Sequence, residues 1–447
     1  MKKTMSRSIA AFILALAFLA GLGYLCFRFF TENDLWASQT YNLYLSTGGG
    51  LTNAGTIYDR NGEVLAESDD GERFYHEDMS IRLGTLHTVG DDSYNISTAV
   101  QTRFRSQLVG HSLVFGYGLP DSLTALNKMT VTLDADACGK VYDAFGGKEG
   151  ACFVYNYKTG EILCMVSTPA FDPQNVPETL PDGSYLNNCV SGTYTPGSVY
   201  KIVTAIAALE YIDDIENMTF TCEGEKDFGG NVVTCMDTHG ELSLDDAFSY
   251  SCNIAFADMA TLVGADKMQK VADRLGVTES FDINGVDSAK GHYDVSDADA
   301  NQLAWSGVGQ YTNMTNPAQM AILCGAIANG GDAALPVYME GAEAAETHSL
   351  LDEDIAERMN EIMRYTVSGH YGETMFGGLT VGAKTGTAEV GDDIEPNAWM
   401  VGYSTDEDYP LAFAVVVEEG GFGFYSAGPI ARIAMIESAE ALGFEAE

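Results

Sequence analysis

Positive charge is scarce in this chain. Its 447 residues include 23 lysines and arginines against 64 aspartates and glutamates, for a formal net charge of −41. A surface of that sign repels phosphate backbones, so the composition argues against nucleic acid as a partner. The sequence also has no internal repeat and no low-complexity tract, and its 46% of hydrophobic residues is too high for wholesale disorder. A chain of this length is expected to form one large domain and a smaller one.

Charged residues are absent from one long stretch near the N-terminus. The run from Ser8 to Phe27 is almost wholly apolar, and three basic residues precede it. Its length matches the roughly 20 residues that cross a bilayer as a helix. A cleavable signal peptide would have a shorter apolar core and a small-x-small cleavage site, which nothing beyond Phe27 supplies. We therefore expect residues 1–30 to be a cytoplasmic tip and an uncleaved anchor. The chain would span the plasma membrane once, with its bulk extracytoplasmic.

Cysteine, by contrast, is plentiful, with nine in the chain. Most of them lie among apolar or small residues, which is typical of buried thiols. Cys222 and Cys235 differ, because they flank the glycine pair 229–230 in a polar segment that favours a hairpin. The sequence does not decide whether these two cysteines form a disulfide. Together with His239 they would supply three zinc ligands. A fourth ligand is not evident in the sequence, so neither a metal nor a cofactor is expected.

Strand patterns stand on both sides of a long helical region. We expect strands over Ala151–Tyr157, Glu161–Ser167, Thr380–Val390, Ala398–Ser404 and Leu411–Glu418, and a closing helix over Ile430–Leu442. This order predicts one antiparallel sheet, flanked by helices, that is built from the two ends of a domain. A break at residues 119–121 divides residues 31–127, a small mixed N-terminal domain, from residues 128–447.

One Ser-x-x-Lys occurs in the chain, at Ser198 and Lys201, where an apolar helix is expected to begin. The serine would lie near unpaired backbone N–H groups, and the lysine one turn later on the same face. Full burial lowers the pKa of a lysine by as much as about 3–5 units, which leaves a neutral amine to take the serine proton. A helix-capping serine with a snorkelling lysine is the alternative for such a motif standing alone.

A second motif, Ser251-Cys252-Asn253, begins another predicted helix. Its serine is suited to relaying a proton, and its amide to orienting a substrate amide. By itself the tripeptide is uninformative, because residues 93–95 have the same Ser-x-Asn pattern.

A third motif, Lys384-Thr385-Gly386-Thr387, lies on a predicted strand. A cation and two hydroxyls there suit a substrate carboxylate, and Gly386 permits close backbone approach. The backbone N–H groups of Ser198 and Thr387 would then form an oxyanion hole. Each motif is weak alone, and the three in this order are a strong signal.

These motifs, in this order, resemble the transpeptidase domain of penicillin-binding proteins. Segments 307–310, 315–321, 326–331 and 398–403 agree with that family, and residues 56–66 resemble the N-terminal signature of class B, the monofunctional transpeptidases. The resemblance covers about residues 50–435 and is closest to the short class B type. It implies the serine β-lactamase/penicillin-binding transpeptidase fold, an α/β (α+β) architecture. Ala54 stands where the family usually has arginine, which puts the partner contacts of the N-terminal region in question.

The resemblance also implies a reaction, the cross-linking of peptidoglycan stem peptides in cell division or elongation. Ser198 would attack the D-Ala-D-Ala bond with Lys201 as base, and β-lactams would acylate the same serine. Ser251 would pass the proton to the leaving D-Ala, with Lys384 nearby. Asn253 would hold the stem-peptide backbone, and Thr385 and Thr387 the terminal carboxylate. The family further implies a SEDS-type glycan polymerase as membrane partner.

Other activities share parts of this pattern. A D,D-carboxypeptidase transfers to water instead of an amine, and the motifs do not separate it from a transpeptidase. A class A β-lactamase needs a glutamate in a Glu-x-x-Leu-Asn pattern, which is missing between Asn253 and Lys384. A β-lactam sensor would need further membrane spans and a His-Glu-x-x-His motif, and neither is present. A non-catalytic divisome scaffold would not need Ser198.

Overall fold

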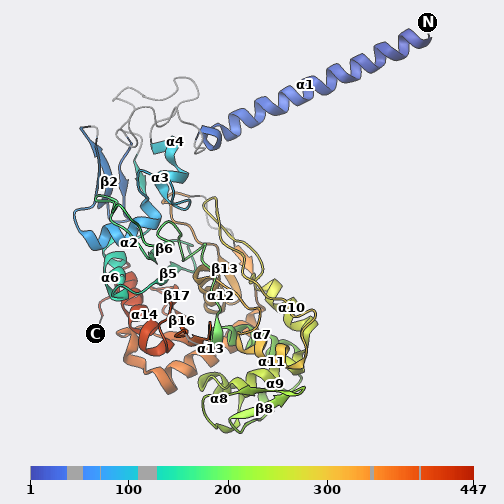
Figure 1. The fold of residues 1–447 in the computed structure, drawn as a ribbon, viewed down its shortest axis with the longest axis vertical. Helices are drawn as coiled ribbons and strands as arrows, with labels where there is room; N and C mark the ends of the chain where they lie inside the picture. The colour runs from blue at the N-terminus through green and yellow to red at the C-terminus, as the bar shows by residue number, and fades with distance from the viewer. Residues whose placement is uncertain are drawn as a thin grey trace.

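The computed structural model describes residues 2–37, 54–70, 72–108, 128–342, 347–391 and 394–446. Helix α1 (Lys2–Ala37) projects away from the rest of the molecule (Figure 1). Its stretch Arg7–Glu32 is, among the described residues, the one helix long and apolar enough to cross a membrane. The predicted single apolar helix is therefore confirmed, although it continues beyond residue 30.

A five-stranded antiparallel sheet lies at the centre, in the order β15-β16-β17-β5-β6. Its strands are β5 (Gly150–Asn156), β6 (Ile162–Thr168), β15 (Val381–Ala388), β16 (Asn397–Ser404) and β17 (Leu411–Val417). The sheet joins the two ends of the region, as predicted. Every residue of β5, β6, β16 and β17 is buried, because helices cover both faces. These strands consequently read as continuous apolar runs instead of alternating ones.

Helices pack on the two faces of this sheet (Figure 1). Helix α12 (Pro317–Ala328) covers one face, and α14 (Gly423–Glu440) with α6 (Ala135–Phe145) covers the other. Helix α12 starts with a capping box in which Asn316 and Gln319 satisfy each other's backbone N–H groups. The predicted closing helix is present in α14, which begins seven residues before Ile430, at Gly423.

The N-terminal region forms a second, four-stranded sheet in the order β3-β2-β1-β4. Its elements are β1 (Ile57–Tyr58), β2 (Val64–Asp69), β3 (Glu72–Tyr75), β4 (Met129–Thr130), α2 (Met79–Val89), α3 (Val100–Arg103) and α4 (Arg105–Leu108). Strand β4 pairs in parallel with β1, although it follows the predicted break at residues 119–121, which lie outside the described residues. One hydrophobic cluster runs from Ala54 to Ala439. The division at residues 127 and 128 therefore stays a prediction.

The middle region carries most helices and several short hairpins. Strands β8 and β9 pair on either side of Gly229 and Gly230, which confirms the hairpin between Cys222 and Cys235. The elements are η2 (Gly197–Tyr200), α7 (Lys201–Tyr211), η3 (Ile215–Asn217), β7 (Phe220–Cys222), β8 (Glu225–Phe228), β9 (Asn231–Thr234), β10 (Gly240–Leu242), α8 (Leu244–Ser249), α9 (Asn253–Val263), α10 (Ala265–Arg274), β11 (Asp282–Ile283), β12 (Val286–Asp287), α11 (Ala300–Val308), β13 (Asp332–Ala334), β14 (Thr347–Ser349), α13 (Glu353–Thr366), η4 (Val367–Tyr371) and η5 (Glu373–Phe376).

Candidate active site

Ser198 lies in a short 3-10 turn, η2, that leads directly into α7. The preceding Gly197 has a φ of +54°, and a Cβ there would stand 2.6 Å from the carbonyl oxygen of Thr387. A side chain at Gly309 would stand 1.9 Å from the carbonyl oxygen of Gly197. The start of the helix is thus pressed against β15 and the loop after α11, and only glycine fits both positions.

Lys201 is fully buried at the start of α7. Its Nζ lies 3.0 Å from Ser198 Oγ and 2.8 Å from Asn253 Oδ1. The carbonyl oxygen of Ser251 is 2.6 Å away and its Oγ 3.1 Å. Burial lowers the pKa of Lys201 from its ordinary value of 10.5 to about 7. The snorkelling alternative is therefore wrong, since this amine is held inside the protein among polar groups from two motifs.

The neutral form of Lys201 matches the groups around it. A neutral amine has two N–H donors and one lone pair. The Ser251 carbonyl and Asn253 Oδ1 accept hydrogen bonds and cannot donate them, so they are natural partners for the two N–H groups. The lone pair is then left for the hydroxyl of Ser198. This arrangement is the one that a base for serine activation needs.

Ser251 is held in an unusual backbone conformation. Its φ is +57°, a value that costs a residue other than glycine about 1–3 kcal/mol. The residue joins α8 to α9, and Cys252 caps α9 by accepting a hydrogen bond from the N–H of Ala255. This strained turn directs both the hydroxyl and the carbonyl oxygen of Ser251 toward Lys201.

The Lys-Thr-Gly motif lies on β15, an edge strand of the central sheet. Lys384 is buried, and its pKa is lowered well below its ordinary value by that burial and by the charge of Lys201. A Cβ at Gly386 would stand 3.0 Å from both the Pro196 carbonyl oxygen and Val199 Cγ1. The glycine therefore lets the strand pack directly on the turn that carries Ser198.

Tyr371, at the end of η4, belongs to the site and was missed in the sequence. Its hydroxyl lies 2.9 Å from Thr385 Oγ1 and 3.0 Å from the Thr385 backbone nitrogen, whose N–H it accepts. Backbone N–H groups alternate in direction along a strand. The N–H of Thr387 therefore faces the same free edge as that of Thr385, on the side that an oxyanion donor requires. No local pattern marks Tyr371, because only the fold brings it to β15.

Four possible metal ligands gather beside the second motif. The side chains of Cys222, Cys235, His239 and Cys252 place one ligand atom each within 4.8 Å of all the others. All three cysteines are free thiols, so Cys222 and Cys235 do not form the disulfide that the sequence left undecided. The sequence suggested three of these residues, and the fourth is the middle residue of the Ser-x-Asn motif.

The predicted site residues thus fall into one constellation. Ser198, Ser251 and Asn253 all contact the Lys201 amine, while Gly386 and Thr387 pack against the turn before Ser198. A serine that is hydrogen-bonded to a buried amine, beside the free edge of a strand, is the arrangement that a serine acyltransferase requires.

Comparison with known proteins agrees with this chemistry. The family model for the penicillin binding protein transpeptidase domain matches residues 150–435. Peptidoglycan D,D-transpeptidase PbpA of Mycolicibacterium smegmatis is 27% identical over 360 residues, which cover 69% of this chain and 71% of the relative. A probable peptidoglycan D,D-transpeptidase FtsI of Caulobacter vibrioides is 28% identical over 284 residues, 61% of this chain and 47% of the relative.

A solved structure extends the likeness to the fold. The ceftriaxone acyl-enzyme complex of penicillin-binding protein A from Mycobacterium tuberculosis matches with a TM-score of 0.76 at 24% identity, covering 87% of this chain and 99% of that one. The predicted fold is thereby confirmed. The chain belongs to the penicillin-binding protein transpeptidase family, and within it to the class B D,D-transpeptidases.

Proposed function

We propose that this protein cross-links peptidoglycan stem peptides that end in D-Ala-D-Ala, with Ser198 as nucleophile and Lys201 as base. The observation that carries the proposal is the buried Lys201 amine, 3.0 Å from Ser198 Oγ and bonded to Asn253. A lysine with a pKa of about 7 is half neutral near neutral pH, and can accept the serine proton there.

In the acylation step, Ser198 Oγ attacks the carbonyl carbon of the penultimate D-Ala and gives its proton to Lys201. The negative charge that develops on the carbonyl oxygen is met by the N–H groups of Ser198 and Thr387. The C–N bond to the terminal D-Ala then breaks, and the proton returns to the leaving amine through Ser251, with Lys384 nearby. The products are free D-Ala and an acyl ester on Ser198.

In the second step an amine of another stem peptide attacks the ester. Lys201 takes a proton from that amine and returns it to Ser198 Oγ as the ester bond breaks, which restores the free enzyme. β-Lactams enter the same first step because they resemble the D-Ala-D-Ala terminus.

Substrate binding falls to Asn253, Thr385, Gly386 and Thr387. The Nδ2 of Asn253 donates to the Thr234 carbonyl oxygen at 3.0 Å, which leaves one amide hydrogen for the stem-peptide backbone. Thr385 and Thr387 are half-buried on β15 and suit the terminal carboxylate. A bound carboxylate would raise the pKa of Lys384, because a nearby negative charge favours the charged form of the amine.

We also propose that the N-terminus is cytoplasmic and that α1, with residues 31–127, contacts a SEDS-type glycan polymerase. Protease added outside intact cells should digest the bulk of the chain and spare an epitope placed before Ser8. Digestion of that epitope would reverse the orientation. Replacement of α1 by an unrelated membrane helix should abolish cross-linking to the polymerase, and unchanged cross-linking would refute the role of α1.

The reaction is tested with the full chain in detergent and a fluorescent penicillin. We expect a stable adduct that Ser198→Ala abolishes, and acylation slowed about a hundredfold by Ser251→Ala. Ser93→Ala is the matched control, because it removes the serine of the other Ser-x-Asn sequence. Absence of an adduct from folded wild-type protein would contradict the assignment of the nucleophile.

Product analysis separates the related activities. With a D-Ala-D-Ala stem peptide and an amine acceptor, we expect D-Ala release together with the cross-linked product. Hydrolysed peptide alone would make the protein a D,D-carboxypeptidase, and rapid release of hydrolysed penicillin would make it a β-lactamase.

A further inference from the structure

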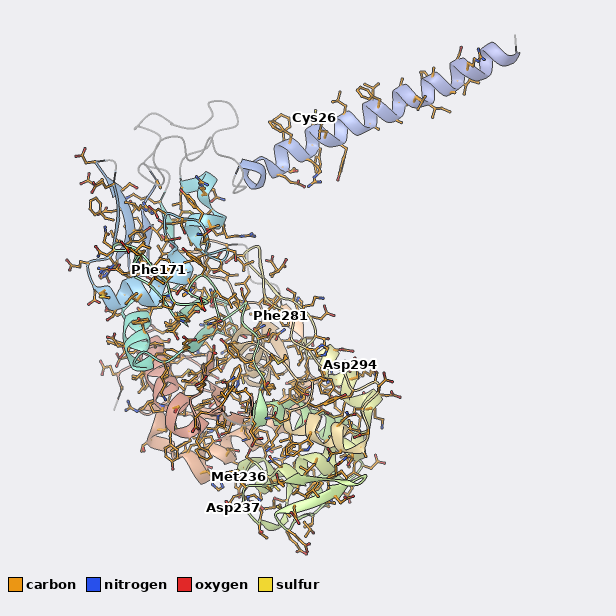
Figure 2. All side chains as sticks on the ribbon, in the orientation of Figure 1. Cys26, Phe171, Met236, Asp237, Phe281 and Asp294 are labelled. Atoms are coloured by element: carbon orange, nitrogen blue, oxygen red, sulfur yellow. The ribbon has the colours of Figure 1, made fainter. Side chains whose placement is uncertain are left out.

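The cluster of Cys222, Cys235, His239 and Cys252 is drawn from four separate places in the chain. Cys222 ends β7, Cys235 follows β9, His239 precedes β10, and Cys252 is the residue that caps α9. Figure 2 labels Met236 and Asp237, which lie between two of the ligands at the end of the molecule opposite α1. The strand pair β7–β10, the hairpin β8–β9 and the catalytic motif therefore meet at this point.

The spacing of the four ligand atoms fits a tetrahedral zinc ion. Bonds of about 2.3 Å to sulfur and about 2.0–2.1 Å to nitrogen put the corners of the tetrahedron about 3.5–3.8 Å apart. Cys235 Sγ and His239 Nδ1 are already 3.6 Å apart. All four atoms lie within 4.8 Å of one another, so small side-chain rotations bring the longer pairs to the same spacing.

We propose that Cys222, Cys235, His239 and Cys252 bind a structural zinc ion that links the strand pair β7–β10 and the hairpin β8–β9 to the Ser251–Asn253 motif. Three thiolates and one imidazole are a soft set of ligands that favours zinc over magnesium or calcium. Four protein ligands leave no coordination position for substrate, so the ion is structural. The site lies beside the catalytic residues and contributes none of them.

A bound metal ion would stabilise the short strands around the cluster. Both two-stranded sheets, β7–β10 and β8–β9, have strands of only three or four residues, and isolated two-stranded sheets are marginal in water. Phe228 and Val233 pack into the main hydrophobic cluster, whereas Val232 and Met236 are exposed, so apolar burial holds only one side of this region. Metal binding by residues that are separate in the unfolded chain adds its free energy directly to folding.

The four-residue cluster is also connected to the catalytic residues. The hairpin β8–β9 ends at Thr234, whose carbonyl oxygen holds the Asn253 side chain at 3.0 Å. Asn253 in turn accepts from Lys201, and Cys252 is its direct neighbour in the chain. A metal ion bound to Cys235 and Cys252 would therefore fix both sides of the Asn253 amide.

Oxidation is the competing fate of these thiols. Two of them joined in a disulfide would no longer be available as thiolate ligands, so zinc and disulfide exclude each other at this position. The proposed extracytoplasmic location permits disulfides, which makes the comparison necessary.

The test is a metal analysis of the full chain, purified in detergent without chelator and with micromolar zinc supplied. We expect about one zinc per chain by plasma mass spectrometry, reduced at least about tenfold in Cys222→Ser and His239→Gln. Cys26→Ser and His292→Gln are matched controls outside the cluster and should keep the metal. Cys252 is left unchanged, because it lies within the catalytic motif.

Cobalt gives a second readout that needs no variant. Wild-type protein loaded with Co²⁺ should show thiolate charge-transfer absorption and the visible bands of a tetrahedral site, and zinc should displace it. A wild-type chain that stays free of metal after reduction and zinc loading would overturn the proposal. So would peptide mapping of the protein from cells that finds two of the three cysteines in one disulfide. Neither result depends on penicillin acylation, so the proposed function is tested separately.

Discussion

The pH dependence of acylation follows directly from the position of Lys201. Burial moves the pKa of this amine from 10.5 to about 7, a change equivalent to about 5 kcal/mol between its two protonation states. The charged form is the one that burial disfavours, and the neutral form is the base. With a pKa of about 7, about 1% of the amine is neutral at pH 5 and about 90% at pH 8.

We therefore expect the second-order rate constant for acylation by fluorescent penicillin to rise about a hundredfold from pH 5 to pH 8 and then to level. The assay is the initial rate of adduct formation on the full chain in detergent, with folding checked by circular dichroism at each pH. A flat profile, a fall with rising pH, or a midpoint near 10 would refute the role of a neutral Lys201.

The second buried lysine provides the control for that assignment. The charge of Lys201 lowers the pKa of Lys384, whereas the pKa of Lys201 is lowered by its own burial. Lys384→Met removes the second amine, so the rise in the pH profile should remain, with its midpoint still near the pKa of Lys201. A profile that loses its rise in Lys384→Met would assign the titration to Lys384 instead.

Two further substitutions test the geometry around β15. Tyr371→Phe removes the hydroxyl that bonds Thr385, and should lower acylation efficiency about fivefold, as expected for about 1 kcal/mol, with little change in melting temperature; an unchanged rate would show that Tyr371 does not position Thr385. Gly197→Ala should destabilise the fold by more than Gly146→Ala in chemical denaturation, because both glycines have a φ above +50° but only the Cβ at Gly197 meets Thr387; equal losses would show that backbone strain alone matters.

Much of the site was readable in the sequence because its motifs are local. Ser198 and Lys201 are one helical turn apart, so their proximity follows from helix geometry wherever the helix is placed. Lys384 and Thr387 stand on one strand between apolar runs, which fixes their approximate orientation. The sheet itself was predictable because four of its strands are buried on both faces and carry long uninterrupted apolar runs.

The parts that the sequence did not reveal depend on contacts between distant segments. Tyr371 reaches Thr385 only because η4 folds back on β15. Strand β4 pairs with β1, which precedes the predicted break at residues 119–121, and no local propensity encodes this pairing. Cys252 is not marked as a metal ligand by its local sequence, because Cys222 and Cys235, its neighbours in space, precede it in separate segments of the chain.

The strained turn at Ser251 connects the catalytic lysine with the cysteine cluster. A serine at φ +57° is unfavourable unless the surrounding structure holds it there. On one side, the Lys201 amine donates to the Ser251 carbonyl. On the other, Cys252 belongs to the cluster that we propose binds zinc, and Asn253 is fixed to the end of β9. The strand pair β7–β10 and the hairpin β8–β9 thus support the strained turn from the side that Lys201 does not reach, and the position of the Lys201 amine depends on support from both sides.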